Sequence, residues 1–245
     1  MKLGKLAPKH DARTLQFDKY LQPAALPKIP ASKDWSGKVP QWLMLANDNL
    51  GCCTISGACH MIMDWSANAN TEIVPTDSDV IKAYSAVSGY NPATGENDNG
   101  AVELDVLNYW RKTGIAQHKI FAYAALQPRN HSHIKAAVYL FGGVYIGLAL
   151  PLSAQNQDIW DIPAGGFAGD GRPNSWGGHA VNVCSYDDNY ITVVTWGALK
   201  KMSWSFASHY MDEAYAVLSN DFINNGVAPN AIDWSALQAD LKSIH

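Results

Sequence analysis

Cys53 has the clearest chemical potential in this sequence, because it stands at the start of a predicted helix. Apolar residues recur at a spacing of about 3.6 residues from Cys53 to about Ala69, and Gly51 allows a tight turn just before them. The unpaired N–H groups and the macrodipole at a helix N-terminus stabilise a thiolate. The pattern predicts a nucleophilic cysteine whose own N–H donates to an oxyanion, with Asn47 or Asn49 as the second donor.

A thiol nucleophile needs a base, and His179 is the preferred candidate among the eight histidines. It follows Gly177 and Gly178 and opens the apolar stretch AVNVC, so its imidazole is expected at the mouth of a strand. A lone histidine in a strand is more often structural than catalytic. The cysteine-led helix in the first half reverses that preference, because together the two residues form the machinery of a thiol hydrolase.

The remaining thiols, Cys52, Cys59 and Cys184, are expected to be small buried side chains. Adjacent cysteines bridge only with strain, and no Cys-x-x-Cys pair is present, so neither a disulfide framework nor a structural zinc site is predicted. Two alternatives for Cys52 stay open: it is the nucleophile, or it is a redox partner of Cys53. Against the first, Cys52 lacks a glycine two residues before it.

The acidic loop that contains Glu96 and Asp98 offers oxygen ligands for calcium, but no glutamate follows at the position that an EF-hand requires. A solvated loop is therefore the preferred interpretation. We expect no metal and no cofactor.

The elements that would position Cys53 and His179 differ between the two halves of the chain. Helices are predicted over residues 53–69, 78–88 (capped by Thr76 or Asp77), 103–113 and 133–141. Strands are predicted over residues 143–150, 179–186, 190–196 and 213–218, with a hairpin turn at residues 187–189. A helical first half and a mostly antiparallel second half predict an α+β fold, with a cleft where the halves meet.

The composition and charge of the chain argue against some classes of binding partner. The 245 residues are 47% hydrophobic and 16% charged, with a formal net charge of -4, which argues against a nucleic-acid-binding surface. No apolar run reaches the roughly 20 residues of a membrane span, and residues 1–9 lack the apolar stretch of a signal peptide. We expect a protein or peptide substrate, no nucleic acid, no membrane and a cytoplasmic location. The oligomeric state stays unknown.

Three regions are predicted along the chain. Residues 1–27 are rich in proline and read as an extended N-terminal arm that lies across the molecule or a neighbouring subunit and limits access to Cys53. Residues 28–222 form the catalytic domain, with a helical half over about 45–125 and a β half over about 126–222. Residues 223–245 are a C-terminal extension.

A series of stretches over about residues 28–220 resembles the papain-like cysteine peptidases, in the same order. They are IPASKDWSGKV (Ile29–Val39), NDNLGCC (Asn47–Cys53), GAVELDVLNYWRKTGI (Gly100–Ile115), HSHIKAAVYLFGGVYIGLAL (131–150) and GGHAVNVCSYDDNYITVVTWG (Gly177–Gly197). The resemblance implies a papain-like fold: a helical left half led by the nucleophile helix, a right half of antiparallel β-sheet or barrel, and a cleft between them.

The resemblance also implies roles for individual residues. Cys53 would be the nucleophile and His179 its base, while Asn47 and the Cys53 N–H would hold the oxyanion. Thr195 would orient the imidazole, and Trp196 would shield that contact from water. Gly51 and Gly178 would line the cleft. Each of the tryptophans at 160, 176, 196 and 204 either lines the cleft or fills the core, and Trp176 is expected in the cleft because it stands next to the glycine pair before His179.

Four positions depart from the family pattern. Thr195 stands sixteen residues after His179, where the family has an orienting asparagine, and Trp196 comes one residue early. Asn47 replaces a glutamine that is one methylene longer, and Thr54 follows the cysteine where the family prefers an aromatic residue.

The function predicted from these residues is hydrolysis of an amide or peptide bond through a Cys–His thioester mechanism. The alternatives are a papain-like scaffold that has lost catalysis and serves as a binding or structural module, and a transglutaminase-like acyltransferase.

Overall fold

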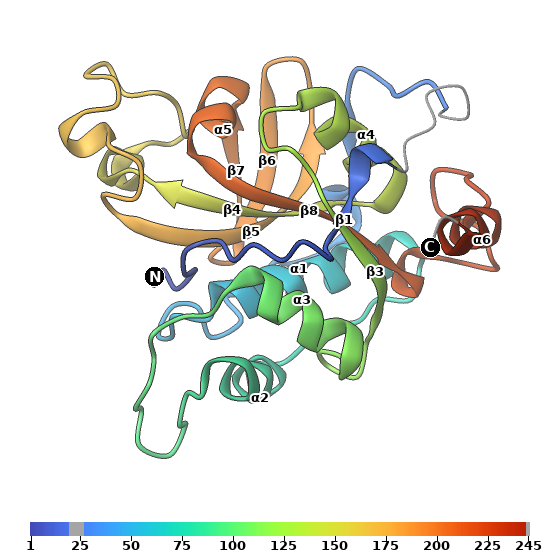
Figure 1. Cartoon of the computed structure of the whole chain (residues 1–245), viewed down its shortest axis with the longest axis horizontal. Helices are drawn as coiled ribbons and strands as arrows, with labels where there is room; N and C mark the ends of the chain where they lie inside the picture. Colours follow the sequence, from blue (N-terminus) through green and yellow to red (C-terminus); the bar gives the residue numbers. More distant parts are fainter. Residues whose placement is uncertain (20–26, 244–245) are drawn as a thin grey trace.

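The structure, a computed structural model, describes residues 1–19 and 27–243 (Figure 1). The helices are α1 (Cys53–Asn68), α2 (Asp77–Ser88), α3 (Glu103–Lys112), α4 (His131–Phe141), α5 (Trp204–Tyr210) and α6 (Trp234–Ser243). The strands are β1 (Leu15–Gln16), β2 (Lys33–Asp34), β3 (Ile120–Ala125), β4 (Val144–Leu150), β5 (Gly177–Tyr186), β6 (Tyr190–Thr195), β7 (Ala198–Ser203) and β8 (Met211–Ser219).

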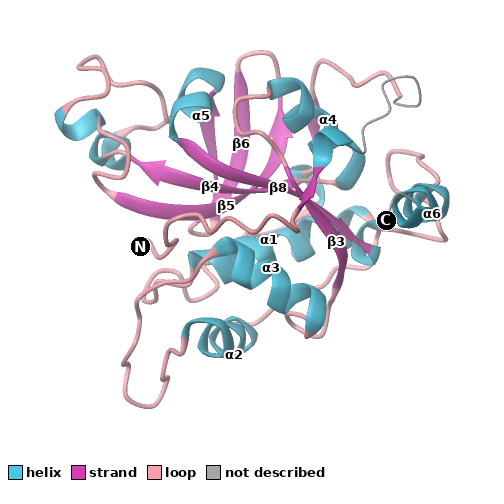
Figure 2. Ribbon diagram, in the orientation of Figure 1, coloured by secondary structure: helices cyan, strands magenta, loops and turns pink. Residues whose placement is uncertain are grey.

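The strands form one sheet in the order β1-β3-β8-β4-β5-β6-β7, and β2 pairs with β5. The pairs are antiparallel except for β1 with β3, so the sheet is mixed, and it is not closed into a barrel. In the view of Figures 1 and 2, α1, α2 and α3 lie below the sheet, and α4 and α5 lie above it. The predicted α+β architecture with two unlike halves is confirmed.

Helix α1 is the central element, because all of its residues are buried. A helix that is apolar or small on every side needs neighbours all round, and α1 packs against β5, α2 and α3. Trp65 stacks on Trp110 of α3 at 5.6 Å and donates from Nε1 to the Phe141 carbonyl at 2.7 Å. Helix α1 is therefore fixed along its whole length.

The predicted helices and the β5–β6 hairpin are found close to their expected bounds. Thr76 caps α2 in a capping box with Asp79, and the Asp187 carboxylate accepts from two N–H groups in the hairpin turn. Strands β3 and β7 were not predicted, since neither shows clean alternation: most of β3 is half-buried, and β7 carries two lysines.

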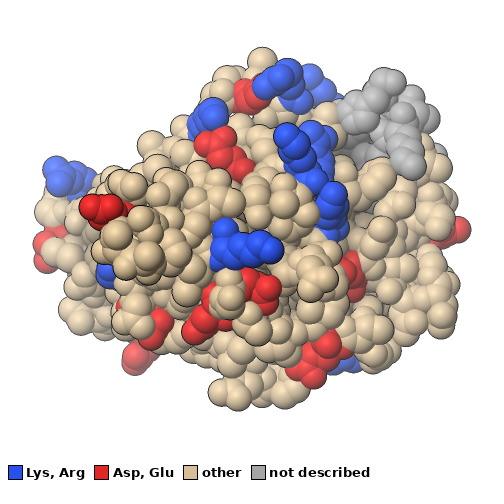
Figure 3. All heavy atoms as spheres, turned by 90° about the horizontal axis from the view of Figure 1, so that it is seen from below, with Lys and Arg blue, Asp and Glu red and all other residues tan. Residues whose placement is uncertain are grey.

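The surface carries few charges for its size. On the face shown in Figure 3, blue and red side chains are interspersed in small groups on a wide uncharged surface. Within residues 1–19 and 27–243, no helix is long and apolar enough to cross a bilayer.

Residues 15–19 depart from the predicted extended arm. They form β1, which pairs with β3, and a 3-10 turn over Phe17–Lys19, with Phe17 buried. Residues 20–26 of the predicted arm lie outside the described residues. The extended part that precedes β1 runs along the junction between the helices and the sheet (Figure 1).

Candidate active site

Cys53 is the first residue of α1, as predicted, and its side chain is buried. The backbone of Ala180 in β5 lies against the thiol and favours its ionised form. Because Ala180 follows His179 directly in the chain, α1 and β5 bring the predicted nucleophile and the predicted base to one junction.

His179 lies near the start of β5, opposite Leu148 of β4, and is buried. Its Nε2 lies 2.6 Å from Oγ1 of Thr195, the last residue of β6. The other ring nitrogen, Nδ1, is buried and has no hydrogen-bond partner within the described residues. The threonine thus occupies the place of an orienting residue, and one nitrogen of the imidazole stays available.

Trp196 covers the imidazole. The two rings stack with centroids 4.3 Å apart and an interplanar angle of 15°. Trp196 has a φ of 46°, a left-handed backbone conformation that costs a bulky residue on the order of 1–3 kcal/mol. Trp176 lies against Trp196 with ring centroids 5.5 Å apart, so both tryptophans predicted for the cleft lie at the site. Trp160 and Trp204 are buried.

The groove at this junction is already occupied by residues 1–6, which we call the N-terminal segment. On the sheet side, the N–H groups of Gly4 and Lys5 donate to the Gly178 carbonyl at 3.3 and 3.1 Å. On the helical side, Leu6 N–H donates to the Ala101 carbonyl at 3.0 Å, and Ala101 N–H donates to the Gly4 carbonyl at 2.8 Å. The segment is therefore bound between the two walls by main-chain hydrogen bonds, as an added peptide strand would be.

Glycine makes this close approach possible. A Cβ on Gly4 would lie 1.8 Å from the Gly51 carbonyl oxygen, and a Cβ on Gly178 would lie 2.1 Å from the Lys5 carbonyl oxygen. Gly51 and Gly178, predicted for the cleft, thus form its walls against the N-terminal segment. The backbone of Gly4 also lies against the Cys53 thiol.

Asn47 is buried, and its side-chain amide donates to the Leu50 carbonyl at 2.9 Å and to the Lys2 carbonyl at 3.1 Å. Trp196 Nε1 donates to the same Lys2 carbonyl at 3.2 Å. The amide that was predicted to hold an oxyanion thus binds a peptide carbonyl in the groove.

The loop of Glu96 and Asp98 is exposed at Glu96, as expected, but Asp98 itself is half-buried. Its carboxylate accepts hydrogen bonds from Gly51 N–H, Tyr84 Oη and Lys2 Nζ, at 2.8, 2.8 and 2.9 Å. Partial burial works against ionisation, but these three donors outweigh it and lower the pKa of Asp98. Asp98 therefore holds the turn before Cys53. In the sequence, the only indication of this role is the turn itself, whose N–H groups need an acceptor.

Burial makes the Cys–His pair neutral in this closed form. It raises the pKa of the Cys53 thiol to about 12 and, with a smaller contribution from His60, lowers the pKa of His179 to about 3. The sequence predicted the opposite shift for Cys53 from its place at a helix N-terminus. Burial of the thiol outweighs the helix contribution.

All four cysteines are free thiols, and the Cys52 thiol is buried. Its Sγ lies 3.4 Å from Ser56 Oγ and 3.6 Å from the Leu45 carbonyl, and burial raises its pKa to about 12. These contacts favour a structural role for Cys52. Within residues 1–19 and 27–243, no group of three or more His, Cys, Asp or Glu side chains could hold a metal ion.

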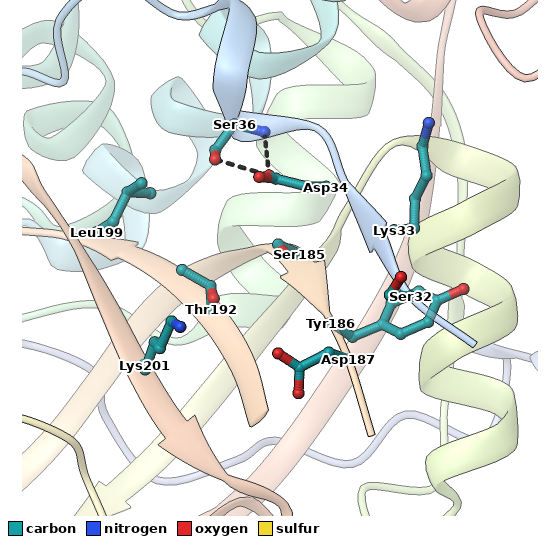
Figure 4. A pocket seen from close by; sticks show the side chains of 10 residues that line it. All are labelled: Ser32, Lys33, Asp34, Ser36, Ser185, Tyr186, Asp187, Thr192, Leu199 and Lys201. Carbon is teal, nitrogen blue, oxygen red and sulfur yellow. Dashed lines mark hydrogen bonds between the residues drawn. The ribbon is translucent and has the colours of Figure 1, made fainter. Parts of the chain in front are cut away.

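A separate surface pocket of about 640 Å³ lies where β2 meets the ends of β5, β6 and β7 (Figure 4). Most of its lining residues are polar, and Asp34 accepts hydrogen bonds from the Ser36 N–H and hydroxyl at 2.9 and 2.7 Å. None of the predicted site residues lines it.

The sequence matches no protein-family model and is not significantly similar to any curated protein. Its structure, in contrast, is similar to solved structures of cysteine proteases. Xylellain, a cysteine protease from Xylella fastidiosa, is 16% identical, with a TM-score of 0.66 over 89% of this chain and 96% of that one.

Solved structures of cysteine proteases from two other organisms are also similar to this chain. Procathepsin B S9 from Trypanosoma congolense is 11% identical, with a TM-score of 0.61 over 89% of this chain and 87% of that one. Bromelain from Ananas comosus is 15% identical, with a TM-score of 0.55 over 78% of this chain and 100% of that one. The chain therefore has the papain-like fold, in a divergent form.

Proposed function

We propose that this chain is a cysteine-dependent hydrolase that cleaves an amide bond of a protein or peptide through a thioester. The observation that carries the proposal is the state of His179. One ring nitrogen is held by Thr195. The other is buried beside the helix that Cys53 begins, with no partner among the described residues. An unpartnered buried nitrogen is costly in a purely structural histidine.

The chemistry follows from this arrangement. In the tautomer that catalysis requires, Nε2–H donates to Thr195 Oγ1, and the Nδ1 lone pair takes the proton from Cys53. The sulfur attacks the carbonyl carbon, the C–N bond breaks as Nδ1 returns the proton to the leaving amine, and a thioester remains. Water activated by the same nitrogen then releases the acid and the free thiol.

The developing oxyanion would be held by two donors. The N–H of Cys53 belongs to the first turn of α1, where backbone donors have no partner within the helix. The Asn47 amide already donates to a peptide carbonyl, that of Lys2. Each such donor contributes roughly a hundredfold or more to the rate in acyl transfer.

A second candidate is a binding module that uses the same groove without catalysis. The observation that favours it is the closed state itself, in which the N-terminal segment fills the groove and burial raises the pKa of Cys53 to about 12. The two candidates differ in what happens to the thiol when the segment leaves.

The test opens the groove with Gly4→Ala, because a Cβ at Gly4 collides with the Gly51 carbonyl. Alkylation of Cys53 by iodoacetamide is followed by mass spectrometry across pH 5–9, in this variant and in Gly4→Ala/His179→Ala. Gly37→Ala is the matched control, because a Cβ at the exposed Gly37 meets nothing within 4 Å.

For a hydrolase, we expect the opened thiol to titrate well below the value of about 8.5 for a free cysteine, and the second change to remove that shift. A thiol that behaves as a free cysteine in both variants would sink the hydrolase and favour the binding module.

A further inference from the structure

The side chain of Lys5 lies in an acidic pocket beside the candidate active site. It is 1% exposed, and its Nζ lies 2.9 Å from Asp212 Oδ2 and 3.0 Å from Glu213 Oε1. Asp212 and Glu213 stand near the start of β8, whereas Lys5 belongs to the N-terminal segment. The cation therefore enters the pocket from a part of the chain that is not built into the sheet.

Glu103, the first residue of α3, completes the pocket. It is fully buried, and neither of its carboxylate oxygens has a hydrogen-bond partner within the described residues. Burial and the neighbouring Glu213 raise the pKa of Glu103, and the charge of Lys5 opposes them. Buried carboxylates without donors are costly unless they take up a proton or a cation stands beside them, so the pocket favours a basic occupant.

The shape of the pocket fits a long, unbranched side chain. Gly147 of β4 lies at its floor, where a Cβ would come within 2.0 Å of Lys5 Cε and 2.7 Å of Glu213 Cγ. Any larger residue at position 147 would fill the space that the lysine methylenes occupy. Tyr215 Oη donates to Glu213 Oε2 at 2.9 Å and fixes that carboxylate.

The pocket takes the side chain of a residue that lies next to the reacting centre. The N–H of Lys5 donates to the carbonyl of Gly178, which directly precedes His179. The preceding residue, Gly4, lies against the Cys53 thiol. A peptide bound in the groove in place of the segment would therefore offer one side chain to this pocket.

We propose that Glu103, Asp212 and Glu213 form a specificity pocket for a basic side chain of a peptide or protein substrate, and that Lys5 fills it while the groove is closed. The assignment of this pocket to a substrate rests on the proposed hydrolase function. Lysine fits best, because its stem passes Gly147 and its ammonium ion contacts the carboxylates of Asp212 and Glu213.

The first experiment needs no catalysis. The synthetic peptide MKLGKLA, which repeats residues 1–7, is added to the Gly4→Ala protein, and protection of Cys53 from iodoacetamide is measured. The control peptide carries norleucine in place of its second lysine. We expect the lysine peptide to protect at a concentration at least about tenfold lower, as for a buried charge pair. Equal protection by both peptides, or none by either up to about 1 mM, would overturn the pocket.

Variants of the pocket sharpen this result. Adding Glu213→Gln to the Gly4→Ala protein should reduce the advantage of the lysine peptide to about threefold or less. Gly147→Ala fills the pocket without removing a charge, so it should act in the same direction even where Glu213→Gln fails to fold. An advantage that survives both changes would mean that Lys5 merely anchors the segment.

The second experiment asks about substrates. The Gly4→Ala protein is given a synthetic peptide library that varies Lys, Arg, Leu, Phe and Glu at each position, and the cleaved sites are read by mass spectrometry. We expect a basic residue at one fixed distance from the cut bond, preferred at least about tenfold. Cleavage without that preference would overturn the pocket and leave the hydrolase standing. Selective protection by the lysine peptide without any cleavage would do the reverse.

Discussion

The two ends of this chain both pack onto the body of the protein, but different forces hold them. At the C-terminal end, the indole of Trp234 is 1% exposed and meets Phe141 and Phe222 edge-on, with ring centroids 5.7 and 6.4 Å apart. At the N-terminal end, residues 1–6 are held by main-chain hydrogen bonds and by the ion pairs of Lys2 and Lys5.

The difference in these contacts indicates which end of the chain detaches more easily from the body of the protein. Exposing a buried indole to water carries a large cost that nothing in solvent offsets. Main-chain hydrogen bonds in a groove exchange with water at a small net cost, typically about 1 kcal/mol each. The C-terminal end is therefore anchored by a core side chain, Trp234, whereas the N-terminal segment is held mainly by polar contacts.

The largest effect on stability is expected at the C-terminal end. Trp234→Ala should lower the free energy of unfolding by about 3–5 kcal/mol, because it leaves a cavity against Phe141 and Phe222. Urea unfolding measures the loss, with Val227→Ala as the control, since Val227 is 46% exposed. A loss of under about 1 kcal/mol would show that the helix, too, is only loosely attached.

The opposite pattern is expected at the N-terminal end. Gly4→Ala should raise the rate of Cys53 alkylation at pH 7 at least about tenfold, because the segment can no longer seat against Gly51. The free energy of unfolding should fall by only about 1–2 kcal/mol. Gly37→Ala should change neither quantity. If the Gly4→Ala protein unfolds completely, the N-terminal segment is as important for stability as the C-terminal end, and the prediction is wrong.

The third prediction concerns pH. Burial lowers the pKa of His179 to about 3 and that of His60 to about 4. As pH falls below about 6.5, these two histidines become protonated in the unfolded chain but stay neutral in the folded chain. Stability should therefore fall by up to about 1.4 kcal/mol per pH unit for each histidine.

Gly4→Ala exposes His179 but leaves His60 under Trp42 and the Leu43 carbonyl. Between pH 6 and 5, the opened protein should lose less stability than the wild type, as measured by urea unfolding at both values. Identical slopes would mean that the N-terminal segment does not control the titration of His179.

The smallest effect is expected from the outer ion pair of the segment. Lys2 is 52% exposed, so Lys2→Met should cost at most about 1 kcal/mol and raise the rate of Cys53 alkylation only a few-fold. Asp98→Ala should act more strongly, since Asp98 also holds Gly51 and Tyr84. Equal effects of the two changes would assign the role of Asp98 to Lys2 alone.

Periodic patterns made much of the fold predictable from the sequence. The spacing of apolar residues after Cys53 and the Thr76 cap placed α1 and α2, and the turn at residues 187–189 placed the β5–β6 hairpin. Strand β3 escaped prediction because its pairing with β1 and β8 joins segments that are far apart in the sequence. Short half-buried strands owe their conformation to such partners.

In the candidate site, too, some residues could be singled out from the sequence and others could not. Cys53 and His179 could be singled out because Cys53 begins α1 after Gly51, and His179 lies near the start of β5 after two glycines. Asp98 could not be predicted, since its partners Lys2, Gly51 and Tyr84 come from three separate segments. The acidic pocket was missed for the same reason: Glu103, Gly147 and Glu213 meet only when α3, β4 and β8 are packed.

The sequence by itself determined which residues could react and which elements carry them, because local periodicity and turn chemistry are written in consecutive residues. Only the tertiary structure decided that residues 1–6 fill the groove, that Trp196 covers His179, and that the Cys–His pair is neutral. The physical reason is that burial and long-range contact depend on the whole packed chain, and burial outweighs the local field of a helix end.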